Sequence, residues 1–453
     1  RNNNRMHVSR RKLIVAAGTA AAALGGCTWL WRSWPEQGLF NPCHAELPAG
    51  LAEHEAVHAA WEGIDPASVW DCHAHLIGTG DSGSGIWLNP DLYSVLHPIQ
   101  FAQRLFFLNA GCADAAPGRV DERYVERMRE LVEGMRPGCK LILLAFDRHH
   151  SESGAPVLED TPIYVPNEFV MRVAHRYPQH FEWAASIHPY RSDAVGALET
   201  AAANGARVVK WLPAAMGIDP ASPRCDPFYR TLAALDLPLI THGGMERAMR
   251  VGARQALGNP LRLRRALDQG VRVVIAHCAT MGEDQDLDRG ENGPYVASFS
   301  LFARLMDDTH YHARLYGDLS AVTQWNRAGP FLRTLIERED WHARLLNGSD
   351  YPLPGVMPMY SLEYLVEIGL LAAPLAPVLT EIRKSNPLLF DFVLKRHLRA
   401  ALSLSEQGPR EAQIAILCDL ARVRMDLQDL PSHNIIEELF QRAIGILEKD
   451  RGT

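Results

Sequence analysis

Two histidines on alternate residues, His73 and His75, are the first side chains with distinctive chemistry. They stand in the run Asp-Cys-His-Ala-His that begins at residue 71, after a short β-like segment. Side chains at positions i and i+2 of a strand point to the same side. Two imidazoles on one side can bind one small object, and a metal ion is the natural candidate. Because such a pair arises by chance in a chain with 19 histidines, the prediction depends on further ligands elsewhere.

Four further ionisable residues stand within or just after short apolar runs. Lys210 lies in Val-Val-Lys-Trp-Leu, His242 follows Leu-Pro-Leu-Ile-Thr, His277 follows Val-Val-Ile-Ala, and Asp350 lies in Gly-Ser-Asp-Tyr-Pro. A single histidine after a strand is more often a hydrogen-bonded core residue, and an aspartate in such a stretch is a good turn residue. The lysine is harder to explain structurally, because burying an unpaired ammonium is costly. Since all four recur in register with one repeat, we predict a shared metal site.

The repeat alternates short apolar runs with longer amphipathic stretches. The predicted strands are 69–73, 140–145, 181–187, 206–212, 238–241, 272–276, 313–319 and 343–346. Helical patterns cover 121–135, 167–176, 194–203, 227–235, 260–269, 299–306 and 330–338. This alternation predicts an α/β fold with a parallel sheet, and eight units predict a (β/α)8 TIM barrel. An open doubly wound sheet is the alternative, but no G-x-G-x-x-G follows the first strand.

In a barrel the carboxyl ends of the strands meet at one mouth, where active sites lie. The first, fourth, fifth, sixth and eighth predicted strands would each deliver an ionisable side chain there. His188, at the end of the third strand, and Trp211, next to Lys210, are further candidates for lining the substrate pocket. A capping or core role for His188 is equally open.

The order H-x-H, Lys, His, His, Asp resembles the amidohydrolase superfamily of metal-dependent hydrolases. The details are most similar to the branch that also holds aminocarboxymuconate-semialdehyde decarboxylase and related non-oxidative decarboxylases. The stretches that carry the resemblance are 71–75, 209–213, 240–244, 276–278, 348–352 and 386–390. It extends over residues 69–396.

The resemblance implies a divalent ion held by His73, His75, one further histidine and Asp350. Asp350 would accept a proton from the attacking water. His277 would either bind a second metal or stabilise the transition state and move a proton. Zinc is the expected ion, with manganese as the alternative.

The role of Lys210 distinguishes the two kinds of metal site that the resemblance allows. In binuclear relatives the corresponding lysine is carboxylated and bridges two metals, which requires the low pKa that burial produces. In the decarboxylase-like branch the site holds one metal, with His242 as the third histidine ligand. Lys210 would then stay a cation and hold a substrate carboxylate. We favour one metal, and the spacing of the residues leaves both arrangements open.

Three functions follow. The leading one is a metal-dependent hydrolase that acts on a small amide, lactone or ester. The alternative is a metal-dependent, non-oxidative decarboxylase of an aromatic or unsaturated carboxylic acid. The third is an inactive, envelope-anchored binding barrel, which the complete ligand set argues against.

The charge and the cysteine pattern of the chain limit the classes of partner and of structural site that it can have. The chain of 453 residues has a net charge of −7, and no basic stripe occurs beyond its N-terminus, which disfavours a nucleic-acid partner. The eight cysteines form no C-x-x-C pair, so they indicate neither a zinc knuckle nor a disulfide framework. One or two disulfides are compatible with an exported protein.

Residues 1–34 predict export or anchoring. Twin arginines at 10–11 before a weakly hydrophobic run resemble a Tat signal, and Leu-Gly-Gly-Cys ending at Cys27 resembles a lipoprotein box. An uncleaved membrane helix over 13–31 is the alternative, and a cytosolic protein is the third. We therefore expect a periplasmic or membrane-anchored protein.

The rest of the chain divides into three parts. Residues 35–68 form a lead-in segment, and residues 69–400 form the barrel. Residues 401–453 form a helical extension that packs under the barrel or mediates a homodimer.

Overall fold

The computed structural model describes residues 38–114, 116–290 and 292–399. The predicted export segment and the predicted C-terminal extension lie outside these residues. Among the helices that are described, none is long and apolar enough to cross a membrane.

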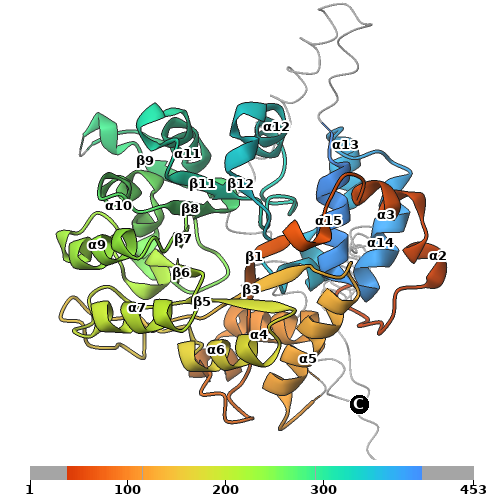
Figure 1. The fold of residues 1–453 in the computed structure, drawn as a ribbon, viewed down its shortest axis with the longest axis horizontal. Helices are drawn as coiled ribbons and strands as arrows, with labels where there is room; N and C mark the ends of the chain where they lie inside the picture. The colour runs from red at the N-terminus through yellow and green to blue at the C-terminus, as the bar shows by residue number, and fades with distance from the viewer. Residues whose placement is uncertain (1–37, 115, 291, 400–453) are drawn as a thin grey trace, which may run out of the picture.

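Eight parallel strands form one sheet that curves into a nearly closed barrel (Figure 1). Their order around the sheet is β1 (Trp70–His75), β3 (Lys140–Leu144), β5 (Phe181–Ala185), β6 (Val208–Trp211), β7 (Leu239–His242), β8 (Val273–Ala276), β11 (Leu315–Asp318) and β12 (Leu345–Leu346). Every predicted strand is present within two residues at its ends. The TIM barrel prediction is therefore confirmed.

The two edge strands meet where the sheet closes. Cys72 N donates to Asn347 O at 2.9 Å, Asp350 N donates to His73 O at 2.8 Å, and His75 N donates to Tyr351 O at 2.8 Å. These bonds join β1 to the chain that follows β12. The closure brings His73 and His75 beside Asp350, although 275 positions separate His75 from Asp350 in the sequence.

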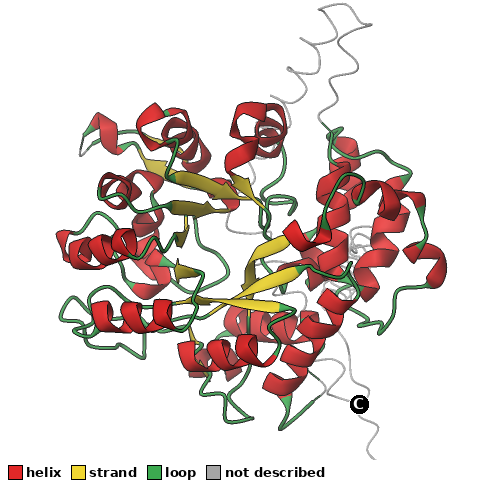
Figure 2. Ribbon diagram, viewed as in Figure 1, coloured by secondary structure: helices red, strands yellow, loops and turns green. Residues whose placement is uncertain are grey.

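Helices cover the outside of the barrel (Figure 2). Those between strands are α4 (Pro98–Ala110), α5 (Val120–Glu133), α6 (Asn167–Arg176), α7 (Ala194–Ala203), α8 (Pro213–Met216), α9 (Asp226–Ala234), α10 (Arg264–Asp268), α11 (Ser298–Asp307) and α12 (Pro330–Glu337). The flanking helices are α2 (Ala49–Ala52), α3 (Glu55–Ala60), α13 (Leu362–Glu367), α14 (Leu375–Ser385) and α15 (Pro387–His397). Two short antiparallel pairs, β2 (Trp87–Leu88) with β4 (Ile163–Tyr164) and β9 (Glu283–Gln285) with β10 (Tyr295–Ala297), lie in the loops. Helix α4 was not predicted from the sequence.

Side chains alternate between the inside of the barrel and the layer under the helices. A small apolar cluster inside the barrel is made only by strand residues: Cys72, Ile142, Leu144, Ala184, Val208, Ile240, Val274 and Ala276. Val209 and Ile275 belong to the large outer core that the helices share. Two-residue periodicity explains this division, and it places Lys210 and His242 inside, two positions after Val208 and Ile240.

Strand β1 breaks the alternation at a bulge. Asp71 pairs with Leu141 and Ala74 pairs with Leu143, so three steps along β1 match two steps along β3. Cys72 accordingly belongs to the inner cluster and Ala74 to the outer core. The extra residue changes which face the following side chains occupy, and this change aims His73 and His75 into the barrel.

A disulfide joins Cys43 of the lead-in to Cys112, which follows α4. Their Cα atoms are 5.8 Å apart, and 69 positions separate them in the sequence. The disulfide therefore links the lead-in covalently to the chain just after α4.

We expect the double variant Cys43→Ser/Cys112→Ser to lose about 3 kcal/mol of unfolding free energy, because the cross-link restricts the unfolded chain. Thermal unfolding with and without dithiothreitol measures this, since the reductant should lower the Tm of the wild type and leave the double variant unchanged. An equal Tm for both proteins under oxidising conditions would contradict a stabilising bond.

Candidate metal centre

Three side-chain atoms converge at the mouth of the barrel. His73 Nε2 lies 3.3 Å from His75 Nε2 and 3.5 Å from Asp350 Oδ1, and His75 Nε2 lies 3.2 Å from the same oxygen. Atoms bound to one tetrahedral zinc ion at 2.0–2.2 Å lie roughly 3.3–3.6 Å apart. The triangle therefore has the size that a single divalent ion requires, and its donor set of two imidazoles and a carboxylate suits such an ion.

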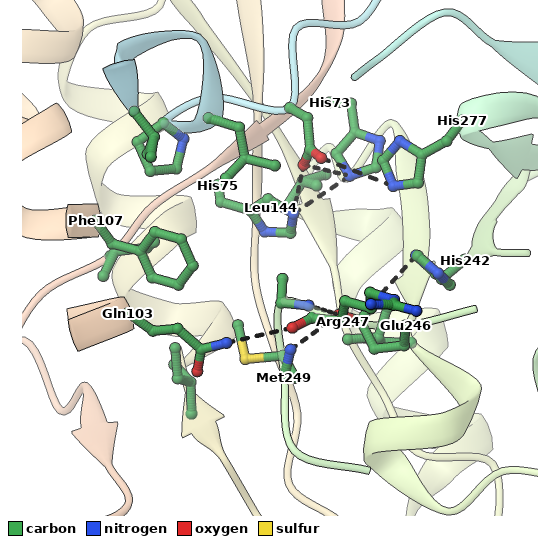
Figure 3. A pocket seen from close by; sticks show the side chains of 18 of the residues that line it. His73, His75, Gln103, Phe107, Leu144, His242, Glu246, Arg247, Met249 and His277 are labelled. Carbon is green, nitrogen blue, oxygen red and sulfur yellow. Dashed lines mark hydrogen bonds and ion pairs between the residues drawn. The ribbon is translucent and has the colours of Figure 1, made fainter. Parts of the chain in front are cut away.

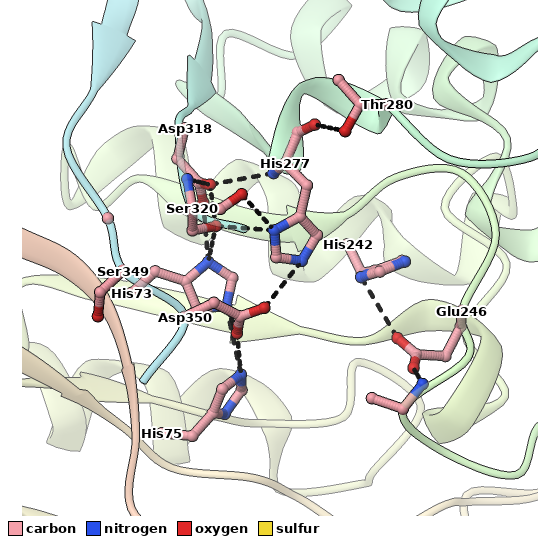
Figure 4. A network of polar contacts seen from close by, with 12 residues as sticks. His73, His75, His242, Glu246, His277, Thr280, Asp318, Ser320, Ser349 and Asp350 are labelled. Atoms are coloured by element: carbon pink, nitrogen blue, oxygen red, sulfur yellow. Dashed lines mark hydrogen bonds and ion pairs between the residues drawn. The ribbon is translucent and has the colours of Figure 1, made fainter. Parts of the chain in front are cut away.

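The other ring nitrogen of His73 is held from behind by Asp318, at the end of β11. Nδ1 donates to Asp318 Oδ2 at 2.8 Å, and both residues are fully buried. The other carboxylate oxygen of Asp318 accepts the backbone N–H of His277 at 3.0 Å and the hydroxyl of Ser320. Figure 4 shows this arrangement. A proton on Nδ1 leaves the lone pair of Nε2 facing the triangle, as metal-binding histidines require.

Asp318 also belongs to a second group of close donors, together with His73 and His277. Its oxygens are already occupied by the histidine, the serine and the backbone N–H donors. Asp318 therefore orients His73, whereas His73 Nε2, His75 Nε2 and Asp350 Oδ1 are the atoms that could hold an ion.

Lys210 lies beside the triangle. Its side chain is 2% exposed, and Nζ donates to His73 Nε2 at 2.9 Å. Burial lowers the pKa of this ammonium, while Asp318 and Asp350 oppose the shift. Lys210 thus lines the site, in a place compatible with either of its two predicted roles.

Two of the predicted residues occupy left-handed backbone. The φ angles are 56° for His277 and 61° for Asp350. For residues with a Cβ this conformation costs about 1 kcal/mol or more. His277 comes directly after β8 and Asp350 four residues after β12, and His277 Nε2 comes within 3.7 Å of Asp350 Oδ2 at the barrel mouth.

The charges of these buried groups depend on one another. Burial raises the pKa of Asp350, but His277, His73 and His75 outweigh it and hold that pKa well below the usual value. Burial, helped by nearby Arg327, lowers the pKa of His277 to about 3. Asp350 is consequently an anion and His277 a neutral imidazole near pH 7, the forms in which each can accept a proton.

His242 lies in the cavity wall, apart from the triangle. Its Nδ1 faces Glu246 Oε2 at 3.3 Å, and its Nε2 lies 3.3 Å from the carbonyl of Met245. Burial raises the pKa of Glu246 to about 7, which permits a protonated carboxyl that donates to His242. His242 does not join the triangle in this arrangement, and its role as a third histidine ligand stays a prediction.

A cavity of about 1140 Å³, its opening to solvent included, leads to the triangle. Figure 3 shows His73, His75 and His277 at one end and Gln103, Arg247 and Met249 at the other. Gln103, from α4, donates to the carbonyl of Arg247 at 3.2 Å. Most of the wall between these ends is apolar, which limits the water that reaches the site.

Two predicted substrate-binding residues do not line this cavity. Trp211 follows the inward-facing Lys210, so strand alternation turns its fully buried indole outward, where it packs on Phe228 and donates to Ile187 O at 2.9 Å. His188 is also fully buried, and its Nε2 lies 2.9 Å from the carbonyl of Met216. Neither side chain lines the cavity, which for His188 fits the core role that the sequence left open, and contact of either residue with a substrate stays a prediction.

Four residues that shape the site were missed. Asp318 carried a readable signal, since it lies inside a predicted strand where an unpaired carboxylate would be costly. Glu246 follows His242 by four residues in an otherwise ordinary loop. Arg327 and Gln103 come from a loop and from an unpredicted helix, and nothing in their local sequence indicates where they lie.

Comparison with known families fits this geometry. The model of the amidohydrolase family matches residues 70–388, which is more than half of the chain. The chain belongs to the amidohydrolase family. A search among curated proteins finds no match.

Several solved structures are similar to this chain at low identity. An uncharacterized TIM-barrel protein from Bordetella bronchiseptica is 16% identical over 73% of this chain and 98% of its own, with a TM-score of 0.40. A probable 2-pyrone-4,6-dicarboxylic acid hydrolase from Acinetobacter baumannii is 14% identical over 72% and 99%, with a TM-score of 0.38. A 5-carboxyvanillate decarboxylase from Sphingomonas paucimobilis is 13% identical over 66% and 98%, also with a TM-score of 0.38.

For this amidohydrolase we expect Asp318→Asn to weaken zinc binding by about tenfold to a hundredfold, because His73 loses the partner that orients its ring. Competition with a chromogenic chelator measures the Kd, and circular dichroism checks the fold. Asp340→Asn, at an exposed aspartate paired with Arg338, is the matched control. An unchanged Kd in the Asp318 variant would exclude the orienting role.

Proposed function

We propose that the protein is a metal-dependent hydrolase that adds water to an amide, lactone or ester. The observation that carries the proposal is the triangle of His73 Nε2, His75 Nε2 and Asp350 Oδ1, with sides of 3.2 to 3.5 Å. A divalent ion, with zinc expected and manganese as the alternative, would be held by these three residues. When bound, it supplies an acidified water and polarises a substrate carbonyl.

The residues of the chain have separate roles in this proposal. Asp350 accepts a proton from water, since its carboxylate is ionised and already lies among the three histidines. His277 receives or returns that proton through Nε2, 3.7 Å from Asp350 Oδ2. Asp318 fixes the ring of His73, and the apolar cavity wall excludes bulk water from the reacting group.

The number of metal ions that the site would hold depends on the chemical state of Lys210. With one ion, Lys210 would stay an ammonium, which donates to His73 Nε2 at 2.9 Å in this structure. With two ions, the low pKa that burial causes would let Lys210 be carboxylated and bridge them. We propose the mononuclear form, because the triangle has the size of a single ion. His242 would then have to turn from Glu246 to become the third histidine ligand.

Non-oxidative decarboxylation of a carboxylic acid is the alternative on the same scaffold, and membership of the family is compatible with both reactions. The two reactions differ in their products: a decarboxylase releases CO2 from the substrate, whereas a hydrolase adds water to it.

We also propose that the protein is exported, as the twin arginines and Cys27 predict. The Cys43–Cys112 disulfide supports this proposal, because disulfides persist mainly in oxidising compartments.

Natively purified protein should contain one divalent ion per chain. Dipicolinate should remove both the ion and the turnover, and Zn²⁺ or Mn²⁺ should restore turnover. Elemental analysis and a screen of amides, lactones and esters provide the measurements. Protein that holds no metal, or that keeps its activity after the metal is removed, would refute the proposal.

Asp350→Asn should lower turnover by about 10²- to 10⁴-fold, because the amide cannot accept the proton of water. The near-equal size of asparagine should leave the fold and the Tm close to those of the wild type. Asp340→Asn again serves as the control. Activity within twofold of the wild type would remove the proposed base from the mechanism.

Product analysis separates the two chemistries. In the presence of H2¹⁸O, a hydrolase should incorporate the label into its product without release of CO2. Stoichiometric CO2 release from an acid substrate would instead establish the decarboxylase.

A further inference from the structure

Arg327 is a buried cation in the cavity wall. It lies in the loop between β11 and α12, its side chain lines the cavity, and it is 7% exposed. Among the described residues, no hydrogen-bond partner reaches its Nε or Nη1. A guanidinium carries five N–H donors and stays charged in proteins. A buried one with free donors is costly unless a ligand completes it.

The nearby carboxylates attract Arg327 without pairing with it. Asp350, Glu246 and Asp318 all act on it electrostatically, but within the described chain none of them forms an ion pair with it at 4.0 Å or less. Asp350 is held by the three histidines, Asp318 by His73 and Ser320, and Glu246 by His242 and the backbone N–H of Met249. The guanidinium is therefore available to a ligand.

The cavity offers an apolar environment for the rest of such a ligand. Phe106 and Phe107 come from α4, Phe146 and Val165 from the segments after β3 and β4, and Met359 from the chain after β12. Apolar walls with one fixed cation are the arrangement that binds a molecule with a charged head and a hydrophobic body.

We propose that Arg327 binds a carboxylate of the substrate. The substrate class is an amphiphilic carboxylic acid, whose carboxylate lies on Arg327, whose apolar body lies on the phenylalanine-lined wall, and whose hydrolysable acyl group reaches the triangle. The assignment of the acyl group rests on the proposed hydrolase function, whereas the carboxylate site rests on Arg327 alone.

Binding of a matched pair of probes tests the proposal. Calorimetry should show that 4-phenylbutyrate binds at least about tenfold more tightly than 4-phenylbutyramide, as hydrogen bonds to a charged group imply. Arg327→Gln should reduce this preference to about onefold, and Arg327→Lys should restore part of it. Arg250→Gln, at an exposed arginine paired with Asp91, controls for a general loss of positive charge.

A second variant covers the case in which Arg327→Gln fails to fold. Gln324 lines the same cavity, and its carbonyl accepts the backbone N–H of Arg327 at 2.9 Å. Gln324→Glu places a carboxylate on that wall and should lower the affinity for the acid by about tenfold while sparing the amide.

All titrations are made on both metal-loaded and chelator-treated protein, because a bound ion can itself attract a carboxylate. Loss of the preference in Arg327→Gln under both conditions supports the proposal. Equal binding of the two probes to the wild type, no binding of the acid, or a preference that survives Arg327→Gln overturns it. Failure of the hydrolase proposal appears separately, as protein without metal that retains an Arg327-dependent preference.

Discussion

Burial of charge at the mouth of the barrel is the constraint on which this structure depends. Lys210, Asp318, Asp350 and Arg327 are 2, 0, 5 and 7% exposed. Each would cost several kcal/mol if buried alone, but the two cations and two anions lie around a shared group of histidines. Asp318 and Asp350 stay ionised because the histidines offset the effect of burial. The two carboxylates thus depend on the histidines around them, whereas Arg327 has no ion-pair partner among the described residues.

Local departures from regular backbone aim these groups. The bulge in β1 turns His73 and His75 inward, and left-handed turns at His277 and Asp350 do the same after their strands end. Gly348 contributes by its small size, because a Cβ there would lie 3.0 Å from the Cβ of His73. The regular barrel brings the ends of the strands to one mouth. These irregular points then bring the side-chain donor atoms close enough together to hold one ion.

The sequence was sufficient for the architecture and for most of the centre, because strand periodicity and the position of strand ends are local properties. It placed Trp211 among the candidates for lining the pocket, whereas the outward direction of this side chain follows from the inward direction of Lys210. The sequence also did not indicate those site residues whose positions depend on the tertiary path of the chain. Arg327 lies in an irregular loop, and Gln103 lies on α4, an inserted helix whose approach to the mouth is fixed by tertiary packing.

The most direct test of the account is a crystal structure of natively purified protein with anomalous data collected at the absorption edge of the metal it contains. The account predicts a peak bonded to His73 Nε2, His75 Nε2 and Asp350, with Asp318 still bound to Nδ1 of His73. A peak held by His277 and Asp318, or no peak at the triangle in metal-loaded protein, would contradict it.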